Sequence, residues 1–172
     1  TLYGAYASGP TASTFMQPHR LSGLLLIWVI NGLMTFYTYF KDYRGDKLAG
    51  KKTIVVKSGL KRSRFYAITS AFLPTITFFF LKFTNMLWIE INNTFVILGI
   101  LTVFLQIWTG VLYYLNTIGK KTYASLRTNF QACVCGQAAI VAFFNPELAI
   151  WLFIFSYIFV GFLFELHVNP KS

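Results

Sequence analysis

Apolar residues fill long stretches of this chain without interruption, and charged residues gather in the short segments between them. A helix needs about 20 apolar residues to cross roughly 30 Å of hydrocarbon. Five stretches free of Asp, Glu, Lys and Arg meet that need, and their spanning parts are residues 21–40, 65–81 (extending to about 85), 94–116, 128–146 and 148–164. The pattern predicts an all-α protein, a polytopic transmembrane helical bundle of about five spans, in one membrane domain over residues 1–172.

Two segments modify this simple picture. Pro74 lies in the middle of the second span; it would kink a helix in a soluble protein, but in a membrane bundle neighbouring groups can satisfy the carbonyl that it frees. Residues 1–19 are free of Asp, Glu, Lys and Arg and rich in Gly, Ala, Ser and Thr. They predict the tail of another helix, ending near Gly9 and Pro10, followed by a loop.

Composition agrees with a membrane protein. Hydrophobic residues make up 56% of the chain and charged residues only 12%, which an ordinary soluble domain of this size cannot bury and a disordered chain does not show. The formal net charge of +10 is often typical of nucleic-acid binding. Here the basic residues lie in the gaps between apolar stretches, so we expect them to set membrane topology, and we expect no nucleic-acid partner.

The distribution of basic residues predicts an orientation. Residues 41–64 hold nine Lys and Arg, residues 120–127 hold three and the C-terminal tail holds one, whereas the other faces carry only Arg20 and Lys82. Alternation over five spans places the three basic segments on one side, and short basic loops stay in the cytoplasm. We therefore expect an integral protein of a bacterial plasma membrane, with loop 41–64 and the C-terminus cytoplasmic.

Asp42 and Asp46 are the only aspartates, and they lie four residues apart just after the first span. If that helix continues one turn past the membrane surface, both carboxylates face the same way. Two neighbouring carboxylates repel each other, and a divalent cation relieves the repulsion. Mg²⁺ suits such a pair, because proteins usually hold it by one or two carboxylates plus substrate phosphates.

Basic residues surround the pair, and their cations are candidates for binding the oxygens of a diphosphate. They are Lys41, Arg44, Lys47, Lys51 and Lys52. A plainer interpretation stays open, in which the segment enforces topology and its acids form surface ion pairs of little energetic value.

Residues 40–59 resemble a known motif. The sequence FKDYRGDKLAGKKTIVV, followed by Gly59, is similar to the second Asp-rich motif of the UbiA-type intramembrane prenyltransferases. That motif has the form D-x-x-G-D, followed by Ala-Gly, basic residues and Thr, and then an apolar triplet and a Gly. The resemblance is specific over this segment, and elsewhere it rests on hydropathy.

The resemblance implies a larger helical bundle around a central cavity. Two Asp-rich motifs there hold Mg²⁺ on the diphosphate of an isoprenoid donor, and a hydrophobic acceptor, such as a quinone precursor, a tetrapyrrole or a lipid alcohol, receives the prenyl group. It implies a catalytic, metal-binding role for Asp42 and Asp46, and diphosphate contacts for the five basic residues. Thr53 matches the motif and is equally a candidate helix cap, and Phe36, Tyr37 and Tyr39 are candidates for lining the cavity.

The chain departs from the family because the first Asp-rich motif is absent. We therefore expect a C-terminal portion of a longer enzyme, or a chain completed by another membrane subunit. Four spans follow the motif, where the family more often shows three. A rival hypothesis is a non-catalytic membrane subunit that uses the basic loop for assembly or for contact with anionic lipids.

These expectations predict that the polypeptide from its native membrane has an intact mass well above 19.7 kDa. Mass spectrometry of the purified polypeptide measures this directly. A mass near 19.7 kDa would instead require a partner chain for the site, or would favour the non-catalytic subunit.

Overall fold

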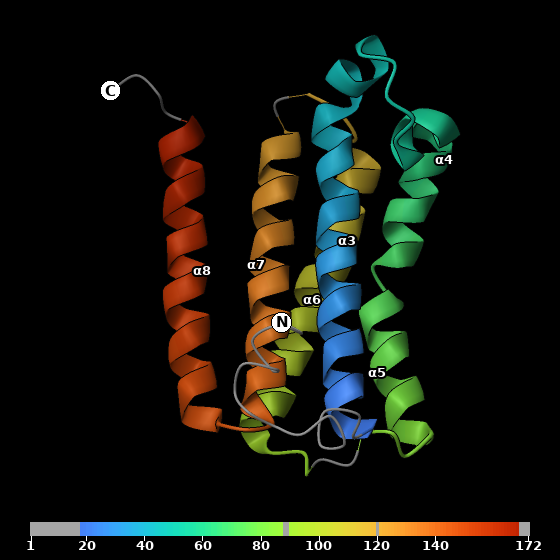
Figure 1. Ribbon diagram of the computed structural model, residues 1–172. Coiled ribbons are helices and arrows are strands. Elements are labelled where there is room, and N and C mark those ends of the chain that lie inside the picture. The colour runs from blue at the N-terminus through green and yellow to red at the C-terminus, as the bar shows by residue number, and fades with distance from the viewer. Residues whose placement is uncertain (1–17, 88–89, 120, 169–172) are drawn as a thin grey trace.

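The computed structural model describes residues 18–87, 90–119 and 121–168, and these residues form an all-α bundle (Figure 1). Its helices are α3 (Pro18–Leu48), α4 (Ile54–Ser70), α5 (Leu73–Phe83), α6 (Asn93–Leu115), α7 (Thr122–Ala142) and α8 (Pro146–Val168). Among the described residues, four segments are long and apolar enough to cross a membrane: 20–48, 54–83, 93–115 and 146–166. The predicted all-α membrane class is confirmed, but the predicted span at 128–146 is not among these four. The partial helix expected in residues 1–9 lies outside the described residues.

The helix boundaries follow the prediction closely for two helices and depart from it for the others. Helix α6 begins and ends within one residue of the predicted span, and α8 extends its span by a few residues at both ends. Helix α3 continues two turns beyond residue 40, because a helix does not need an apolar surface once it leaves the hydrocarbon. The prediction for α7 was wrong: this helix begins six residues before residue 128 and includes Arg127, which pairs with Glu165 at 3.3 Å.

The second span, which was predicted as one helix, is broken in two just before Pro74. Pro74 is the second residue of α5, a position where its missing N–H removes no helical hydrogen bond, and Ala71 and Phe72 separate the two helices. The start of the span differs from the prediction, because residues 54–64 are helical rather than a loop. Gly59, with φ of +72°, interrupts α4 after its first turn.

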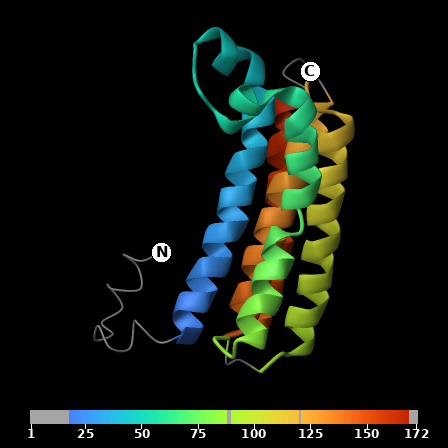
Figure 2. The same ribbon diagram turned by 90° about the vertical axis from the view of Figure 1, so that its right-hand side faces the viewer.

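Helix α7 lies at the centre of the packing and contacts α3, α6 and α8 (Figures 1 and 2). Its buried face is built from small residues, among them Ala132, Cys135, Gly136 and Ala139. A Cβ on Gly136 would meet the side chains of Ile30 and Thr102 at 3.0 and 3.1 Å. Small side chains therefore allow the neighbouring backbones to approach closely. Because most of α7 is buried, it does not need the strongly apolar surface of the other spans.

Polar contacts join α3 to α7 inside the bundle. The Asn31 side chain accepts a hydrogen bond from Gln137 Nε2 at 3.1 Å, and Asn129 Nδ2 donates to the carbonyl oxygen of Met34 at 3.0 Å. Buried amides need such partners, since no water reaches them. These bonds fix the register of α3 against α7.

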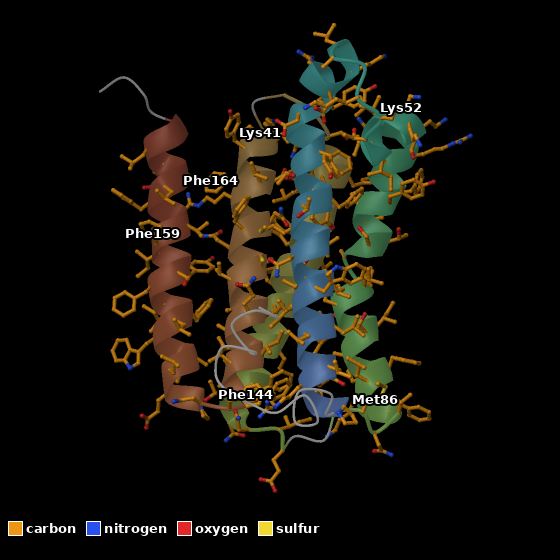
Figure 3. All side chains as sticks on the ribbon, in the orientation of Figure 1. Lys41, Lys52, Met86, Phe144, Phe159 and Phe164 are labelled. Carbon is orange, nitrogen blue, oxygen red and sulfur yellow. The ribbon has the colours of Figure 1, made fainter. Side chains whose placement is uncertain are left out.

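Helix α8 flanks α7 on the outside of the bundle and presents apolar side chains such as Phe159 outward (Figure 3). Gly161 leaves room on α8 for the Arg127 guanidinium, which lies 3.1 Å from where a Cβ would stand. Arg127 reaches Glu165 from this position.

One end of the bundle holds the α3–α4 connection, the α6–α7 connection and the C-terminal end of α8 (Figure 1). We call this end, residues 41–64, 116–119, 121–122 and 165–168, the charged end. The α5–α6 and α7–α8 connections lie at the opposite end, where Figure 3 labels Met86 and Phe144. The described parts of the first two predicted basic segments therefore share one end of the bundle with the end of α8, and residues 169–172 of the C-terminal tail lie outside the described residues. That this end faces the cytoplasm stays a prediction.

The close crossing of α4 and α6 is testable. A Cβ on Gly110 would lie 2.9 Å from the Ala71 methyl and 3.1 Å from the Ala67 carbonyl oxygen. Gly110→Ala should therefore push the helices apart and lower the free energy of unfolding by about 1–3 kcal/mol. The control is Gly99→Ala, whose new Cβ meets nothing closer than 3.8 Å. Thermal unfolding of both variants in one detergent measures the difference, and equal midpoints would contradict this packing.

Candidate functional site

Asp42 and Asp46 lie in the last two turns of α3, on one face of the helix, as the prediction required. At 100° per residue, both fall on a stripe that also holds Trp28, Thr35 and Tyr39. We call these five residues, together with Gly32, the open stripe. Trp28 is 72% exposed on it, and Gly32 and Thr35 are exposed.

The open stripe is opposite the packed face of α3. Leu33, Tyr37 and Phe40 on that packed face are 0–4% exposed, and they form a cluster with α4 and α6. The aspartates therefore lie on the side of α3 that faces away from its contacts with α4 and α6, at the charged end. Asp42 is exposed there, whereas Asp46 is buried next to Lys51 of the α3–α4 connection.

The two carboxylates have different surroundings. Asp42 is exposed, whereas Asp46 is 6% exposed and its Oδ1 lies 3.0 Å from the Lys51 ammonium. A carboxylate this buried needs a partner, because burial removes the water that stabilises its charge. Lys51 is the partner that the structure provides.

A helix cap brings Lys51 to Asp46. Gly50 has φ of +68°, the left-handed conformation that glycine adopts without steric cost, and its N–H donates to the Lys47 carbonyl oxygen at 3.3 Å. The Lys51 N–H donates to the Asp46 carbonyl oxygen at 2.9 Å. These two bonds form a Schellman motif. In this motif the side chains at the positions of Asp46 and Lys51 commonly meet through an apolar contact. Here the contact is an ion pair, and the Ala-Gly-Lys sequence after the helix was the available signal for it.

The other basic candidates are placed differently. Lys41 lies 5.1 Å from the centre of the Tyr123 ring, so its charge is directed toward α7 and away from the aspartate pair. Arg44, Lys47 and Lys52 are exposed at the charged end, where Figure 3 labels Lys41 and Lys52. Of the five predicted cations, Lys51 is the one that pairs with an aspartate in the described part of the chain.

The aromatic and hydroxyl candidates also lie in different places. Tyr37 belongs to the core: its ring stacks on Tyr113 at 4.7 Å and its hydroxyl donates to the Ala67 carbonyl oxygen at 2.7 Å. The expectation that it lines a cavity beside the aspartates was wrong, because five residues of helix turn it away from Asp42. Tyr39 lies on the open stripe. Thr53 is the N-cap of α4, since its Oγ1 accepts a hydrogen bond from Val56 N–H at 3.4 Å.

The donor set fits a magnesium ion carried with a phosphate. Two carboxylates one helical turn apart match what Mg²⁺ takes from proteins when phosphate oxygens and water complete its shell. Within residues 18–87, 90–119 and 121–168, no three His, Cys, Asp or Glu side chains gather as a metal cage. Asp42 is free to ligate, whereas Asp46 must first release Lys51.

Comparison of the chain with protein-family models, with curated proteins and with solved structures gives no match. The functional argument therefore rests on the residues of the open stripe and of the charged end.

The Asp46–Lys51 pair is testable by substitution. Lys51→Met should lower the free energy of unfolding by roughly 0.5–1 kcal/mol, because Lys51 is largely exposed and solvent screens the pair. Lys52→Met, at the next and equally exposed position, should change it less. Thermal midpoints of the two variants measure this. Equal midpoints would show that the ion pair adds nothing to stability.

Proposed function

We propose that this chain carries one Asp-rich site of a Mg²⁺-dependent intramembrane prenyltransferase. Such an enzyme moves a polyprenyl group from an isoprenoid diphosphate to a hydrophobic acceptor, such as a quinone precursor, a tetrapyrrole or a lipid alcohol. The observation that carries the proposal is the position of Asp42 and Asp46: they lie one helical turn apart at the end of a long apolar helix, at the charged end of the bundle, with Asp42 exposed and Asp46 held by Lys51.

The membrane placement is part of the proposal. Four segments among the described residues have the length and apolarity of membrane spans, and thirteen of the fifteen Lys and Arg lie in residues 41–64, residues 120–127 or the C-terminal tail of the sequence. We assign the charged end to the cytoplasmic side of a bacterial plasma membrane. A water-soluble diphosphate head then meets the aspartates at the membrane surface, while its hydrocarbon tail stays in the bilayer.

Each residue near the pair has a defined part in this proposal. Asp42 and Asp46 would hold Mg²⁺, which when bound neutralises the diphosphate and makes it a better leaving group. Lys51, which now pairs with Asp46, would be available to diphosphate oxygens in the same site if Asp46 held the metal. Arg44 and Lys47 on the last turns of α3 add positive charge around the leaving group.

The open stripe is suited to the hydrocarbon chain of the isoprenoid diphosphate. Tyr39 lies one turn below Asp42, and Thr35 lies one further turn into the span. Thr35 Oγ1 donates to the Asn31 carbonyl oxygen at 2.9 Å, so its polarity is satisfied within the helix. An aromatic face next to the departing diphosphate stabilises developing positive charge on the prenyl carbon. The opposing wall and second Asp-rich motif would come from another part of the polypeptide or from another subunit.

A second candidate has its own supporting observation. Asp46 already has a partner within a helix cap, and Leu48 and Ile54 beside it are 91% and 49% exposed. Exposed apolar side chains among basic ones are typical of a surface that lies on anionic lipid headgroups. On this hypothesis the chain is a non-catalytic membrane subunit, and the aspartates have no role in prenyl transfer.

Neutralising the aspartates separates the two candidates. Asp42→Asn and Asp46→Asn, each in the full polypeptide in native membranes, should lower prenyl transfer from a radiolabelled isoprenoid diphosphate by about 100-fold or more. The amides keep the size of the carboxylates but lose the charge that Mg²⁺ requires. The matched control is Glu147→Gln, an exposed acid in the first turn of α8 at the opposite end.

Binding of Mn²⁺, followed by electron paramagnetic resonance, is the second measurement. Asp42→Asn should weaken Mn²⁺ binding in the presence of inorganic diphosphate, and Glu147→Gln should leave it unchanged. Prenyl transfer that survives both aspartate substitutions at the level of the control would remove the enzyme hypothesis and leave the non-catalytic subunit.

A further inference from the structure

An apolar cavity of about 290 Å³ lies between α5 and α6, with α3 and α7 behind it. Its walls are almost wholly carbon. The Thr102 hydroxyl on its lining donates to the Leu98 carbonyl oxygen at 2.7 Å, so this hydroxyl does not require a water in the cavity. Cavities of this composition stay free of water and take apolar ligands.

The broken second span creates this cavity. Gly110 allows α4 to lie close against α6, whereas α5, after the break at residues 71–72, packs on α3 instead. Helices α5 and α6 therefore diverge, and their contact is slight. Their rings meet at Phe78 and Phe95, with centroids 5.2 Å apart. Gly99 widens the gap, because it has no side chain on the lining.

The cavity is remote from the aspartates. Leu26 and Ile30, which line it, precede Asp42 by 16 and 12 residues, or about 24 and 18 Å along the helix axis. Buried Leu33, Tyr37 and other core side chains fill the bundle interior between the two sites. The cavity therefore belongs to the half of the bundle away from the charged end, and it is separate from the proposed diphosphate site.

We infer that this cavity binds one acyl chain of a bilayer phospholipid, from the leaflet opposite the charged end. The inference rests on the membrane placement proposed above and is independent of prenyl transfer. Phe79 and Ile100 on the lining of the cavity are 64% and 67% exposed, so lipid chains reach its edge. Lipid chains are as apolar as the lining, so the gain comes from van der Waals contacts that an empty cavity lacks.

The size of the cavity limits its occupant. At about 290 Å³ it is at the lower end of small-ligand sites, which begin near roughly 300 Å³, and about twice the roughly 150 Å³ that holds a benzene molecule. It accommodates part of one hydrocarbon chain. A polar headgroup would find no partner on its walls and must remain at the membrane surface.

Photolabelling tests the assignment. The full polypeptide is reconstituted into phosphatidylethanolamine and phosphatidylglycerol vesicles with a trace of phosphatidylethanolamine that carries a diazirine on one acyl chain. After irradiation, peptide mass spectrometry should find the label concentrated on residues 74–79 and 95–103. Gly99→Trp fills the cavity and should reduce the label on residues 74–79 by about tenfold. Ile97→Trp is the matched control, since Ile97 is 65% exposed on the same helix and outside the cavity lining.

Each other outcome overturns the inference in a distinct way. Label spread evenly over all lipid-facing helices, or reduced equally by both tryptophan variants, would mean ordinary contact with bulk lipid. Label displaced by a prenyl alcohol but not by excess phospholipid would mean an isoprenoid site. Gly99→Leu fills the cavity with a smaller side chain and should also reduce the label on residues 74–79. Circular dichroism of all variants shows whether each one is folded. A polypeptide that does not float with the vesicles would instead remove the membrane placement and with it the proposed function.

Discussion

The bundle depends on the close approach of helices around α7, which small side chains make possible. Between apolar helices in a membrane the hydrophobic effect gives little attraction, so van der Waals contact and interhelical hydrogen bonds must hold them together. Both need backbones that come close. Gly136 and its Ala neighbours supply the approach, and Asn129 and Gln137 supply hydrogen bonds to α3. With α7 central, α3 keeps a packed face toward α4 and α6, and the aspartates lie on the side that faces away from those contacts.

At the charged end, the C-terminus of α3 holds both a helix cap and a candidate metal ligand. The last turns of α3 must end in water, and Gly50 ends the helix in a motif that satisfies its carbonyl groups. The same turn brings Lys51 back onto Asp46, so a structural ion pair and a candidate metal ligand occupy one position. A site of this kind is stable without its ligand because the lysine takes the place of the metal's charge. The ion pair is therefore compatible both with the prenyltransferase and with the non-catalytic subunit.

The break in the second span leaves a cavity between α5 and α6. Helix α4 packs on both α6 and α3, whereas α5 packs on α3 and has little contact with α6, so a cavity remains between α5 and α6. Pro74 lies in the first turn of α5, just after the break. Gly110 on α6 allows the end of α4, before the break, to pack closely against α6. The cavity and the aspartates thus lie on different sides and at different depths of the same bundle.

Local rules in the sequence were enough to predict the helical class, most of the apolar spans and the shared face of Asp42 and Asp46, because span length and the helical repeat do not depend on neighbouring helices. The break before Pro74, the extension of α3 to Leu48 and the early start of α7 were not predicted, since a charge ends an apolar run without ending a helix. The ion pair between Lys51 and Asp46 depends on the left-handed conformation of Gly50, which hydropathy does not specify. The core position of Tyr37 and the divergence of α5 from α6 depend on which faces of distant helices meet, and hydropathy along one chain does not specify that either.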